Sequence, residues 1–553
     1  MFSPRFYFTI CTFCAIFCTT NISGLSAQSE NKSFLITKNL SILNAIVREL
    51  ELNYVDSLEY DKFFNESIDG MLEKLDPYTT YFPESETEQL TFMTKGEYVG
   101  IGAIISKKGD DVCIAELYEG KPAQKANLRV GDVIVEINGI KIKGLSTEIA
   151  SSYLKGPVNS SVKIKVLRDG KVLVKEFLRE KIQINPVEYF EVVAPRVGYI
   201  KLGEFTDKSA FEFKKSLLEM TSSDSIESLI VDLRNNGGGI VDEAVKILGL
   251  FLPKSTLVAF TKGKNKQSDR MYKTPLEPLF PKMRIAVLTN RLSASASEIL
   301  AGAFQDLDKG VIVGERTYGK GLVQSVNPIP FNGNLKITIA KYYIPSGRCI
   351  QAYNYSRREE DGSVARIPDS LTKEFKTVNG RIVRDGGGVL PDTLIKLDKQ
   401  LNIAHYLYIQ NQYSEFANDF VKNHNQIDSP DKFELDQQTF NDFVSFITKS
   451  KFTYVSQTQK LFNDFLESAK VEGCDKLATT EIEALKVKLA LNIPQSMEAH
   501  ASKIKEYLSV EIIKRYFYQK GTIEYFMDKD KEIGLAKSIL QNKLLYDKIL
   551  HVK

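Results

Sequence analysis

The sequence predicts an α/β protein of several domains, with a smaller domain of short strands before the α/β core and helical regions at both ends. At 553 residues the chain is long enough for three or four folding units. Apolar runs and helical patterns alternate between residues 185 and 398, which is typical of an α/β sheet. Residues 96–184 instead contain short strands separated by turns, while residues 28–95 and 399–553 show helical periodicity.

Composition and charge exclude several classes of function. The chain carries 73 basic and 70 acidic residues, a net charge of +3, which indicates no nucleic-acid partner and no attraction to a membrane surface. Three of the six cysteines lie in the first 18 residues, and the other three are widely spaced. Neither a disulfide framework nor a zinc-binding spacing is present, and we expect no metal and no organic cofactor.

The first 27 residues have the pattern of a signal peptide. Arg5 precedes an apolar run from Phe6 to Cys18, and small residues then lead to Ala27, the expected cleavage position. The apolar run is short for a membrane span, and an uncleaved anchor is the alternative. We therefore expect the protein to be exported.

Residues 33–94 are expected to be helical. Apolar residues repeat at helical spacing in Ile42–Leu52 and again in Phe63–Leu75. Asp76-Pro77 is expected to end the second helix, because a proline disfavours the helical conformation of the residue before it. These helices are interpreted as packing or oligomerisation elements, so one expectation is a homo-oligomer formed through the helical ends.

The segment 96–184 carries two connected patterns. The glycine-rich text Y-V-G-I-G precedes a strand, and K-P-A-Q-K-A-N-L-R-V-G-D-V-I-V-E-I-N-G follows. Together they resemble a circularly permuted bacterial PDZ domain. The resemblance implies that the loop binds a peptide's terminal carboxylate through backbone amides and that the adjacent strand edge accepts the peptide as an added strand. The implied loop residues are Tyr98, Val99, Gly100, Ile101 and Gly102.

The predicted core strands are short, branched and apolar. They are Val197–Ile200, Leu229–Leu233, Ile285–Leu288 and Val311–Val313. The second strand continues into R-N-N-G-G-G and then a helix, so backbone N–H groups gather at a helix N-terminus and favour an anion. A phosphate loop is the alternative, but its Gly-Lys-Ser/Thr ending is absent.

The text S-A-S-A-S-E follows the strand Ile285–Leu288. Ser293 or Ser295 can cap the next helix, with Glu298 as the acidic partner. A serine at this junction lies at the positive end of the helix dipole, where negative charge is stabilised. A lysine between two glycines, Lys320, follows the next strand. Taken singly, these patterns indicate only a cap and a turn.

Together the motifs resemble the carboxy-terminal processing proteases, which are secreted serine peptidases with a crotonase-like α/β core interrupted by a PDZ domain. The matching text runs from Leu75 to Asp392 and includes, in order, L-D-P-Y-T-T-Y-F, D-L-R-N-N-G-G-G, S-A-S-A-S-E-I, V-G-E-R-T-Y-G-K-G-L-V-Q, A-K-Y-Y-I-P-S-G-R and G-V-L-P-D. The resemblance implies Ser295 as nucleophile, Lys320 as general base and Gln324 as the residue that positions the lysine.

The same resemblance implies further roles. The N–H groups of Ala296 and Gly238 would form the oxyanion hole, although many relatives have proline where Gly237 stands. Arg168 occupies the position where some relatives have an arginine that links PDZ occupancy to activity. Family analogy also adds a periplasmic location and an adaptor protein as one expectation.

The histidines argue for a lysine base. His405, His424, His500 and His551 all lie beyond the α/β core, which excludes a trypsin-like protease. A lysine must be neutral to accept a proton, and burial disfavours its charged form. The leading hypothesis is an exported endopeptidase that recognises the C-terminal tails of unfolded or C-terminally exposed proteins. The alternative is an inert PDZ-based scaffold of the cell envelope.

Overall fold

The computed structural model describes residues 31–87, 90, 95–359, 361–395, 402–489 and 492–552, and the predicted signal peptide lies outside them. The chain divides into two compact units, Met1–Pro77 and Tyr78–Lys553. Within the described ranges, no helix has both the length and the apolar character needed to cross a membrane.

The first unit contains two helices, residues 31–53 and α2 (Tyr60–Leu72). The helix 31–53 leaves large apolar side chains exposed, including Phe34, Ile36 and Leu40. The prediction that Asp76-Pro77 ends the second helix is wrong: α2 ends at Leu72, and the amide of Glu73 bonds to the Asp69 carbonyl. Proline restricts only the residue before it, so the helix is free to end earlier in a turn.

The expectation of helix through residues 33–94 is wrong at residues 80–86, and residues 91–94 lie outside the described residues. The second unit begins with strand β1 (Thr80–Phe82) and a 3-10 turn, η1 (Glu84–Glu86). Threonine and aromatic residues favour strands, and β1 pairs with β18 (Asn334–Tyr343).

The α/β core is a six-stranded sheet in the order β10-β11-β12-β15-β16-β21. Strands β11 to β21 are parallel to one another, and β10 runs antiparallel to β11. All four predicted core strands are present, and they are continuously apolar because a parallel sheet is buried on both faces. The strands are β10 (Val187–Ala194), β11 (Val197–Leu202), β12 (Ser228–Asp232), β15 (Arg284–Thr289), β16 (Gly310–Gly314) and β21 (Thr393–Leu394).

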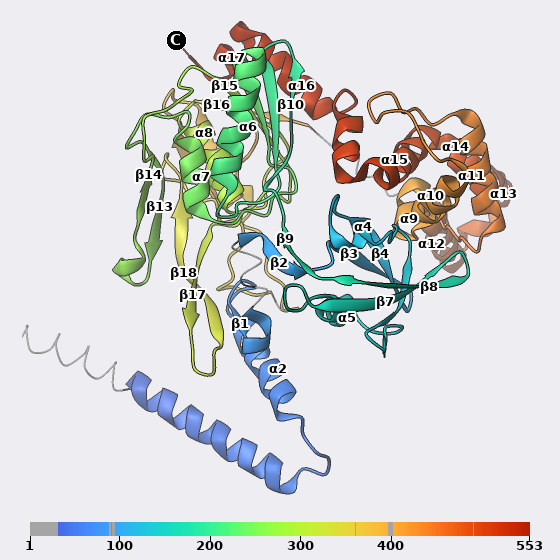
Figure 1. Ribbon diagram of the computed structural model, residues 1–553, viewed down its shortest axis with the longest axis horizontal. Coiled ribbons are helices and arrows are strands. Elements are labelled where there is room, and N and C mark those ends of the chain that lie inside the picture. Colours follow the sequence, from blue (N-terminus) through green and yellow to red (C-terminus); the bar gives the residue numbers. More distant parts are fainter. Residues whose placement is uncertain are drawn as a thin grey trace, which may run out of the picture. The chain divides into compact units, whose positions relative to one another are not determined.

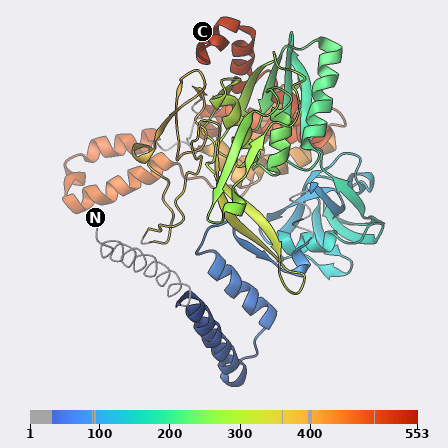
Figure 2. The same cartoon turned by 90° about the vertical axis from the view of Figure 1, so that its left-hand side faces the viewer.

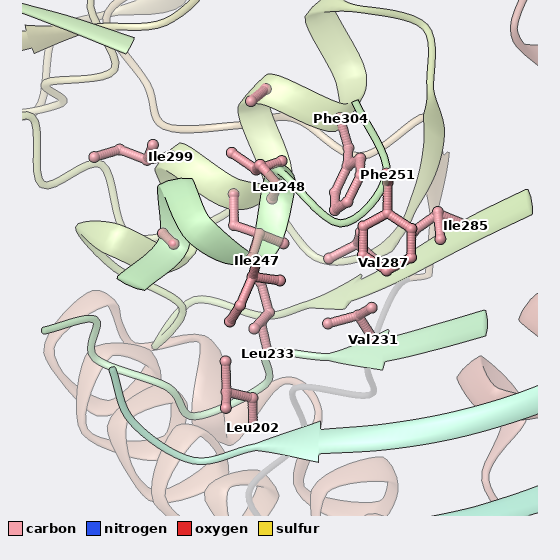
Figure 3. Packing of buried hydrophobic residues seen from close by; sticks show 14 of the residues in the cluster. Leu202, Val231, Leu233, Ile247, Leu248, Phe251, Ile285, Val287, Ile299 and Phe304 are labelled. Carbon is pink, nitrogen blue, oxygen red and sulfur yellow. The ribbon is translucent and has the colours of Figure 1, made fainter. Parts of the chain in front are cut away.

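One face of this sheet packs against α6 (Ser209–Asp224), α7 (Val241–Leu248) and α8 (Ala296–Asp306). Figure 3 shows Phe304 of α8 and Phe251 close to the strand residues Ile285 and Val287. These side chains are at most 1% exposed. Because α8 is fixed by this packing, its N-terminus is held at the carboxyl ends of β12 and β15.

The other face is covered by α16 (Lys531–Gln541) and α17 (Lys543–Ile549). The Tyr546 hydroxyl accepts from the Ile285 amide and donates to the Lys309 carbonyl. The sequence assigns these helices to a separate region starting at residue 399, but physically they complete the core. An uncovered face of a parallel sheet would expose apolar residues, and these helices supply the cover.

Arg234 links the core sheet to the start of α16. Its guanidinium lies 2.6 Å from a carboxylate oxygen of each of Asp232, Asp530 and Glu532. Burial opposes ionisation of Asp232, but Arg234 and Lys201 hold the pKa of Asp232 at about 2.

Arg234→Ala is expected to lower the free energy of unfolding by about 3–5 kcal/mol at pH 7, because it leaves buried carboxylates unpaired. The folded pKa of Asp232 lies below the ordinary 3.8, so its stabilising contribution is full above that pH and is lost as the pH falls toward 2. Urea unfolding tests both effects. Arg196→Ala, in an exposed pair with Glu227, is the control and should change stability by less than about 1 kcal/mol. Equal losses in the two variants would contradict this account.

A second sheet lies beside the core. It contains β1, β18, β13 (Leu257–Gly263) and β14 (Met271–Lys273) in order, and β17 (Leu322–Pro328) pairs with β18. A turn with positive φ at Phe331 and Asn332 precedes β18. A small hairpin, β19 (Glu374–Lys376) and β20 (Ile382–Arg384), belongs to the polar segment after β18.

The PDZ-like domain is inserted between β1 and β10. The chain enters it through β2 (Glu97–Gly100) and leaves through β9 (Glu180–Gln183), and these two strands pair with each other. Its sheet has the order β3-β4-β5-β7-β8, with β6 on β5 and β3 at one end. The elements are β3 (Ala103–Lys108), β4 (Asp111–Leu117), α4 (Pro122–Lys125), β5 (Val133–Ile137), β6 (Ile140–Lys141), α5 (Thr147–Leu154), β7 (Ser161–Arg168) and β8 (Lys171–Leu178).

The C-terminal helical region packs beside the PDZ-like domain (Figure 1). Lys108 pairs with Glu415, and the Gln124 side chain donates to the Tyr518 hydroxyl at 2.6 Å. Tyr518 has non-helical angles inside α15. Figure 2 shows α12 and α13 as adjacent helices. The helices are α9 (Ile403–Ile409), α10 (Gln412–Asn423), α11 (Gln437–Lys449), α12 (Gln457–Glu472), α13 (Thr479–Leu489), α14 (Ile493–Ala499) and α15 (Ala501–Phe526).

Candidate active site

The three serines of S-A-S-A-S have different environments. The Ser293 hydroxyl donates to the Leu233 carbonyl at 2.8 Å, and the Ser297 hydroxyl donates to the Asn236 carbonyl at 2.9 Å. Both side chains are fully buried, and their hydrogen bonds connect the segment after β12 to the start of α8. Two of the three serines therefore have structural roles, and the predicted role of Ser295 as nucleophile stays a prediction.

Ser295 is the N-cap of α8 and has φ 56° and ψ −114°. Few non-glycine residues adopt such angles, and strained backbone of this kind concentrates at functional sites. The side chain is 7% exposed at the positive end of the helix. The predicted partnership with Glu298 is present, since the Ser295 amide donates to Glu298 Oε2 at 3.0 Å.

Glu298 connects the serine turn to the lysine loop. Its Oε2 accepts from the amides of Ser295 and Lys320, the latter at 2.8 Å. Its Oε1 accepts from the Gly319 amide at 2.7 Å and from the Thr317 hydroxyl at 2.6 Å. The side chain is fully buried; burial raises the pKa of the carboxyl, and these four hydrogen bonds oppose the rise. One buried carboxylate thus holds the backbones of Ser295 and Lys320 together.

Lys320 follows Gly319 in the loop between β16 and β17. A second tie fixes this loop, because the Tyr318 amide donates to the Ser293 carbonyl. The Lys320 ammonium lies over the ring of Tyr78, 4.4 Å from its centroid. Tyr78 belongs to the L-D-P-Y-T-T-Y-F text, for which the sequence suggested no chemical role.

Gln324 lies on β17, and its side chain donates to the Thr338 hydroxyl at 3.2 Å. Among the described residues, the Gln324 side chain forms this hydrogen bond and forms no hydrogen bond with the Lys320 side chain. The structure places Gln324 on the strand pair β17–β18 that follows the lysine loop. Its role stays a prediction.

Gly238 lies against Ser295, as predicted. A Cβ on Gly238 would stand 2.7 Å from the Ser295 Cβ, and the φ of Gly238 is +100°, so only glycine fits. The Gly238 N–H donates to Asn236 Oδ1 at 2.9 Å, and its role in the oxyanion hole stays a prediction. The Ala296 N–H has no hydrogen-bond partner among the residues that the structure describes.

Asn236 is a site residue that sequence reasoning missed. It is fully buried, and its side-chain amide also donates to the Leu202 carbonyl at 2.8 Å. The available signal was its place in D-L-R-N-N-G-G-G, between a strand and the glycines. The Asn236 side-chain oxygen is the hydrogen-bond acceptor of the Gly238 amide.

The predicted carboxylate-binding loop is divided between a strand and a turn. Tyr98, Val99 and Gly100 belong to β2, whereas Ile101 and Gly102 lie between β2 and β3. Gly102 has φ +73°, and a Cβ there would stand 2.4 Å from the Lys121 Cβ. The turn therefore needs this glycine and leads directly into the edge strand β3.

Arg168 is held within the PDZ-like domain. Its guanidinium forms two hydrogen bonds of 2.6 Å with Asp132 and one of 2.8 Å with the Asn127 carbonyl. It lines a cavity of about 650 Å³ between this domain and the helical region, with Lys422 and Arg515 opposite. The structure does not bring Arg168 to Ser295, and its coupling role stays a prediction.

Among the described residues, no group of three or more His, Cys, Asp or Glu side chains is arranged to hold a metal ion.

Three family models match the chain. Peptidase family S41 matches residues 196–357, a PDZ domain matches residues 99–176, and the C-terminal helical domain described as that of a probable PDZ-protease matches residues 403–540. The matched order agrees with the elements described above.

Named relatives cover the same region. The carboxy-terminal-processing protease of Bartonella bacilliformis is 31% identical over 333 residues, which cover 59% of this chain and 75% of the relative. A probable CtpA-like serine protease of Staphylococcus aureus is 33% identical over 337 residues, which cover 61% of this chain and 66% of the relative. Among solved structures, the photosystem II D1 C-terminal processing protease is 28% identical, covers 63% of this chain and 86% of that chain, and has a TM-score of 0.37. The chain belongs to peptidase family S41, among the carboxy-terminal-processing proteases.

Proposed function

We propose that this protein is an exported serine endopeptidase that captures the C-terminal tails of protein substrates in its PDZ domain and cleaves peptide bonds with Ser295 and Lys320. One observation carries the proposal: the Glu298 carboxylate accepts hydrogen bonds from the backbone amides of Ser295 and Lys320. Nucleophile and base are thereby fixed on neighbouring turns, as acyl transfer requires.

The chemistry follows from these positions. Neutral Lys320 accepts the proton of the Ser295 hydroxyl as its oxygen attacks the scissile carbonyl. The lysine then gives that proton to the leaving amine, and an acyl-enzyme remains on Ser295. Water attacks the acyl group, Lys320 accepts a proton from the water and returns it to the serine oxygen, and a new C-terminus is released.

The oxyanion is assigned to the N–H groups of Ala296 and Gly238. The Ala296 amide stands at the first turn of α8, where the helix dipole favours negative charge. The Gly238 amide must first leave Asn236 Oδ1. Without substrate, Glu298 already joins the serine and lysine turns, whereas the Gly238 amide is hydrogen-bonded to Asn236.

The tail-binding site is assigned to the Ile101-Gly102 turn, the edge strand β3 and helix α5. Ala103 and Ile105 on β3 pack toward the domain core, so alternate residues of an added strand would meet an apolar surface. Tails that end in apolar residues and carry a free carboxylate are the expected ligands.

Amidation of the terminal carboxylate is expected to weaken binding of an apolar tail peptide by about 10- to 100-fold, because hydrogen bonds to a charged group are lost. Fluorescence anisotropy with the free-acid and amidated forms of one peptide measures this ratio. The Ser295→Ala protein is used so that cleavage does not interfere. Equal affinities would contradict the assignment of the loop. Binding without any cleavage by the wild-type protein would favour the inert scaffold instead.

Assembly and location belong to the same proposal. The exposed apolar side chains of helix 31–53 support a homo-oligomer formed through the helical ends. The signal-like first 27 residues and the family support export to the periplasm, and an adaptor protein remains part of the proposal.

A further inference from the structure

Tyr78 and Lys320 meet although they are far apart in the sequence. The Lys320 Nζ lies 4.4 Å from the centroid of the Tyr78 ring, well within the range of a cation–π interaction. Tyr78 lies two residues before the start of β1, which pairs with β18 of the second sheet. The ring is therefore carried by the sheet that also contains Gln324.

Other tyrosines hold this ring in place. The Tyr78 hydroxyl lies 3.4 Å from those of Tyr318 and Tyr355. The rings of Tyr78 and Tyr355 meet edge to face, with centroids 6.0 Å apart at 89°. Tyr353 adds contacts to both Tyr318 and Tyr355. Tyr78 is thus part of a cluster of four aromatic rings beside the lysine loop.

The contact is between a cation and a neutral ring. Burial, together with the neighbouring tyrosines, raises the pKa of Tyr78 far above its ordinary 10.0, so its hydroxyl stays protonated throughout the working range. The ring face attracts an ammonium group and gives no comparable attraction to a neutral amine. The contact therefore favours the protonated form of Lys320.

We propose that Tyr78 is a positioning residue for Lys320: its ring holds Nζ and sets the pH at which the lysine becomes a base. This inference rests on the proposed function, in which Lys320 activates Ser295. Tyr78 makes no covalent step and acts only through the lysine.

Other titratable groups surround the same loop. The hydroxyls of Tyr318 and Tyr355 bond to Tyr78, and the Glu298 carboxylate binds the Lys320 backbone amide. On β18, the Lys336 ammonium lies over the Phe82 ring at 5.5 Å. Tyr78→Leu and Tyr78→Phe both remove the bonds of the Tyr78 hydroxyl to Tyr318 and Tyr355, so the comparison of these two variants with each other isolates the contribution of the ring.

The test follows the labelling of Ser295 by a fluorophosphonate probe, with intact-protein mass spectrometry of the chain 28–553 between pH 5.5 and 10. The midpoint of the rate–pH curve reports deprotonation of the base. Tyr78→Leu is expected to lower this midpoint by about 0.4–1.5 pH units, which corresponds to the loss of a cation–π interaction of about 0.5–2 kcal/mol. Tyr78→Phe keeps the ring face and should keep the midpoint within about 0.3 units.

A series that preserves shape removes the question of folding. Phenylalanine and its mono-, di- and trifluorinated forms at position 78 have nearly the same size but a progressively weaker ring quadrupole. The midpoint is expected to fall stepwise with fluorination. A constant or rising midpoint across the series would overturn the role of Tyr78, even if Tyr78→Leu failed to fold.

The proposed function fails in a different way. If the wild-type protein were labelled no faster than Ser295→Ala at any pH, Ser295 would not be the nucleophile, and the inference would fall with it. Labelling of wild type alone, with no midpoint shift in the Tyr78 series, would overturn only the inference.

Discussion

Ser295→Ala is expected to abolish peptide-bond cleavage, with a loss of about 10⁴- to 10⁶-fold in kcat, because no other group in the site supplies the nucleophile. Binding of a C-terminal tail peptide should be unchanged, since the PDZ domain is a separate part of the chain with its own core. Product formation from an unfolded substrate, followed by mass spectrometry, measures the loss.

Ser293→Ala provides the matched control within the same motif. Its hydroxyl donates to the Leu233 carbonyl in a fully buried position, so its removal should cost about 1–3 kcal/mol of stability. Cleavage by the folded Ser293→Ala protein should stay within about tenfold of wild type. Equal losses in both variants would mean that the motif supports the fold and that the nucleophile lies elsewhere.

Glu298→Gln is expected to lower kcat/KM by at least about 100-fold and the free energy of unfolding by about 2–4 kcal/mol. The carboxylate accepts four hydrogen bonds, from Ser295, Thr317, Gly319 and Lys320. A glutamine would turn its NH₂ group toward two of those donors, and the turns that carry serine and lysine would separate.

The control for Glu298→Gln is Glu227→Gln, at an exposed carboxylate paired with Arg196. This surface change should alter stability by less than about 1 kcal/mol and leave cleavage unaffected. Urea unfolding and initial-rate kinetics on both proteins provide the comparison. A stable Glu298→Gln protein with wild-type kinetics would show that the carboxylate does not position the pair.

Local patterns predicted the parts of this molecule that depend on local physics. The core strands follow from continuous apolar runs, and the cap at Ser295 follows from a glutamate three residues later. Each of these features is encoded within a few neighbouring residues.

Long-range contacts were missed for a corresponding reason. Helical periodicity predicted helices after residue 399, but it could not show that α16 covers the core sheet. The contact of Lys320 with Tyr78 joins residues that are far apart in the sequence, and no spacing encodes it. The bond from the Gly238 amide to Asn236 is local, but it depends on the orientation of the Asn236 side chain, which the sequence does not specify. The helix stop at Asp76-Pro77 was misplaced because proline limits where a helix can end but does not require it to continue that far.

The most direct test of the central claim is to trap the acyl-enzyme. The chain 28–553 is mixed with an unfolded protein that ends in apolar residues, quenched in acid within the first turnovers and digested for mass spectrometry. The account predicts an acyl adduct on Ser295 together with paired products, and neither from Lys320→Ala at neutral pH. An adduct on another residue, or products formed at the wild-type rate by Lys320→Ala, would contradict the assignment of Ser295 and Lys320 as nucleophile and base.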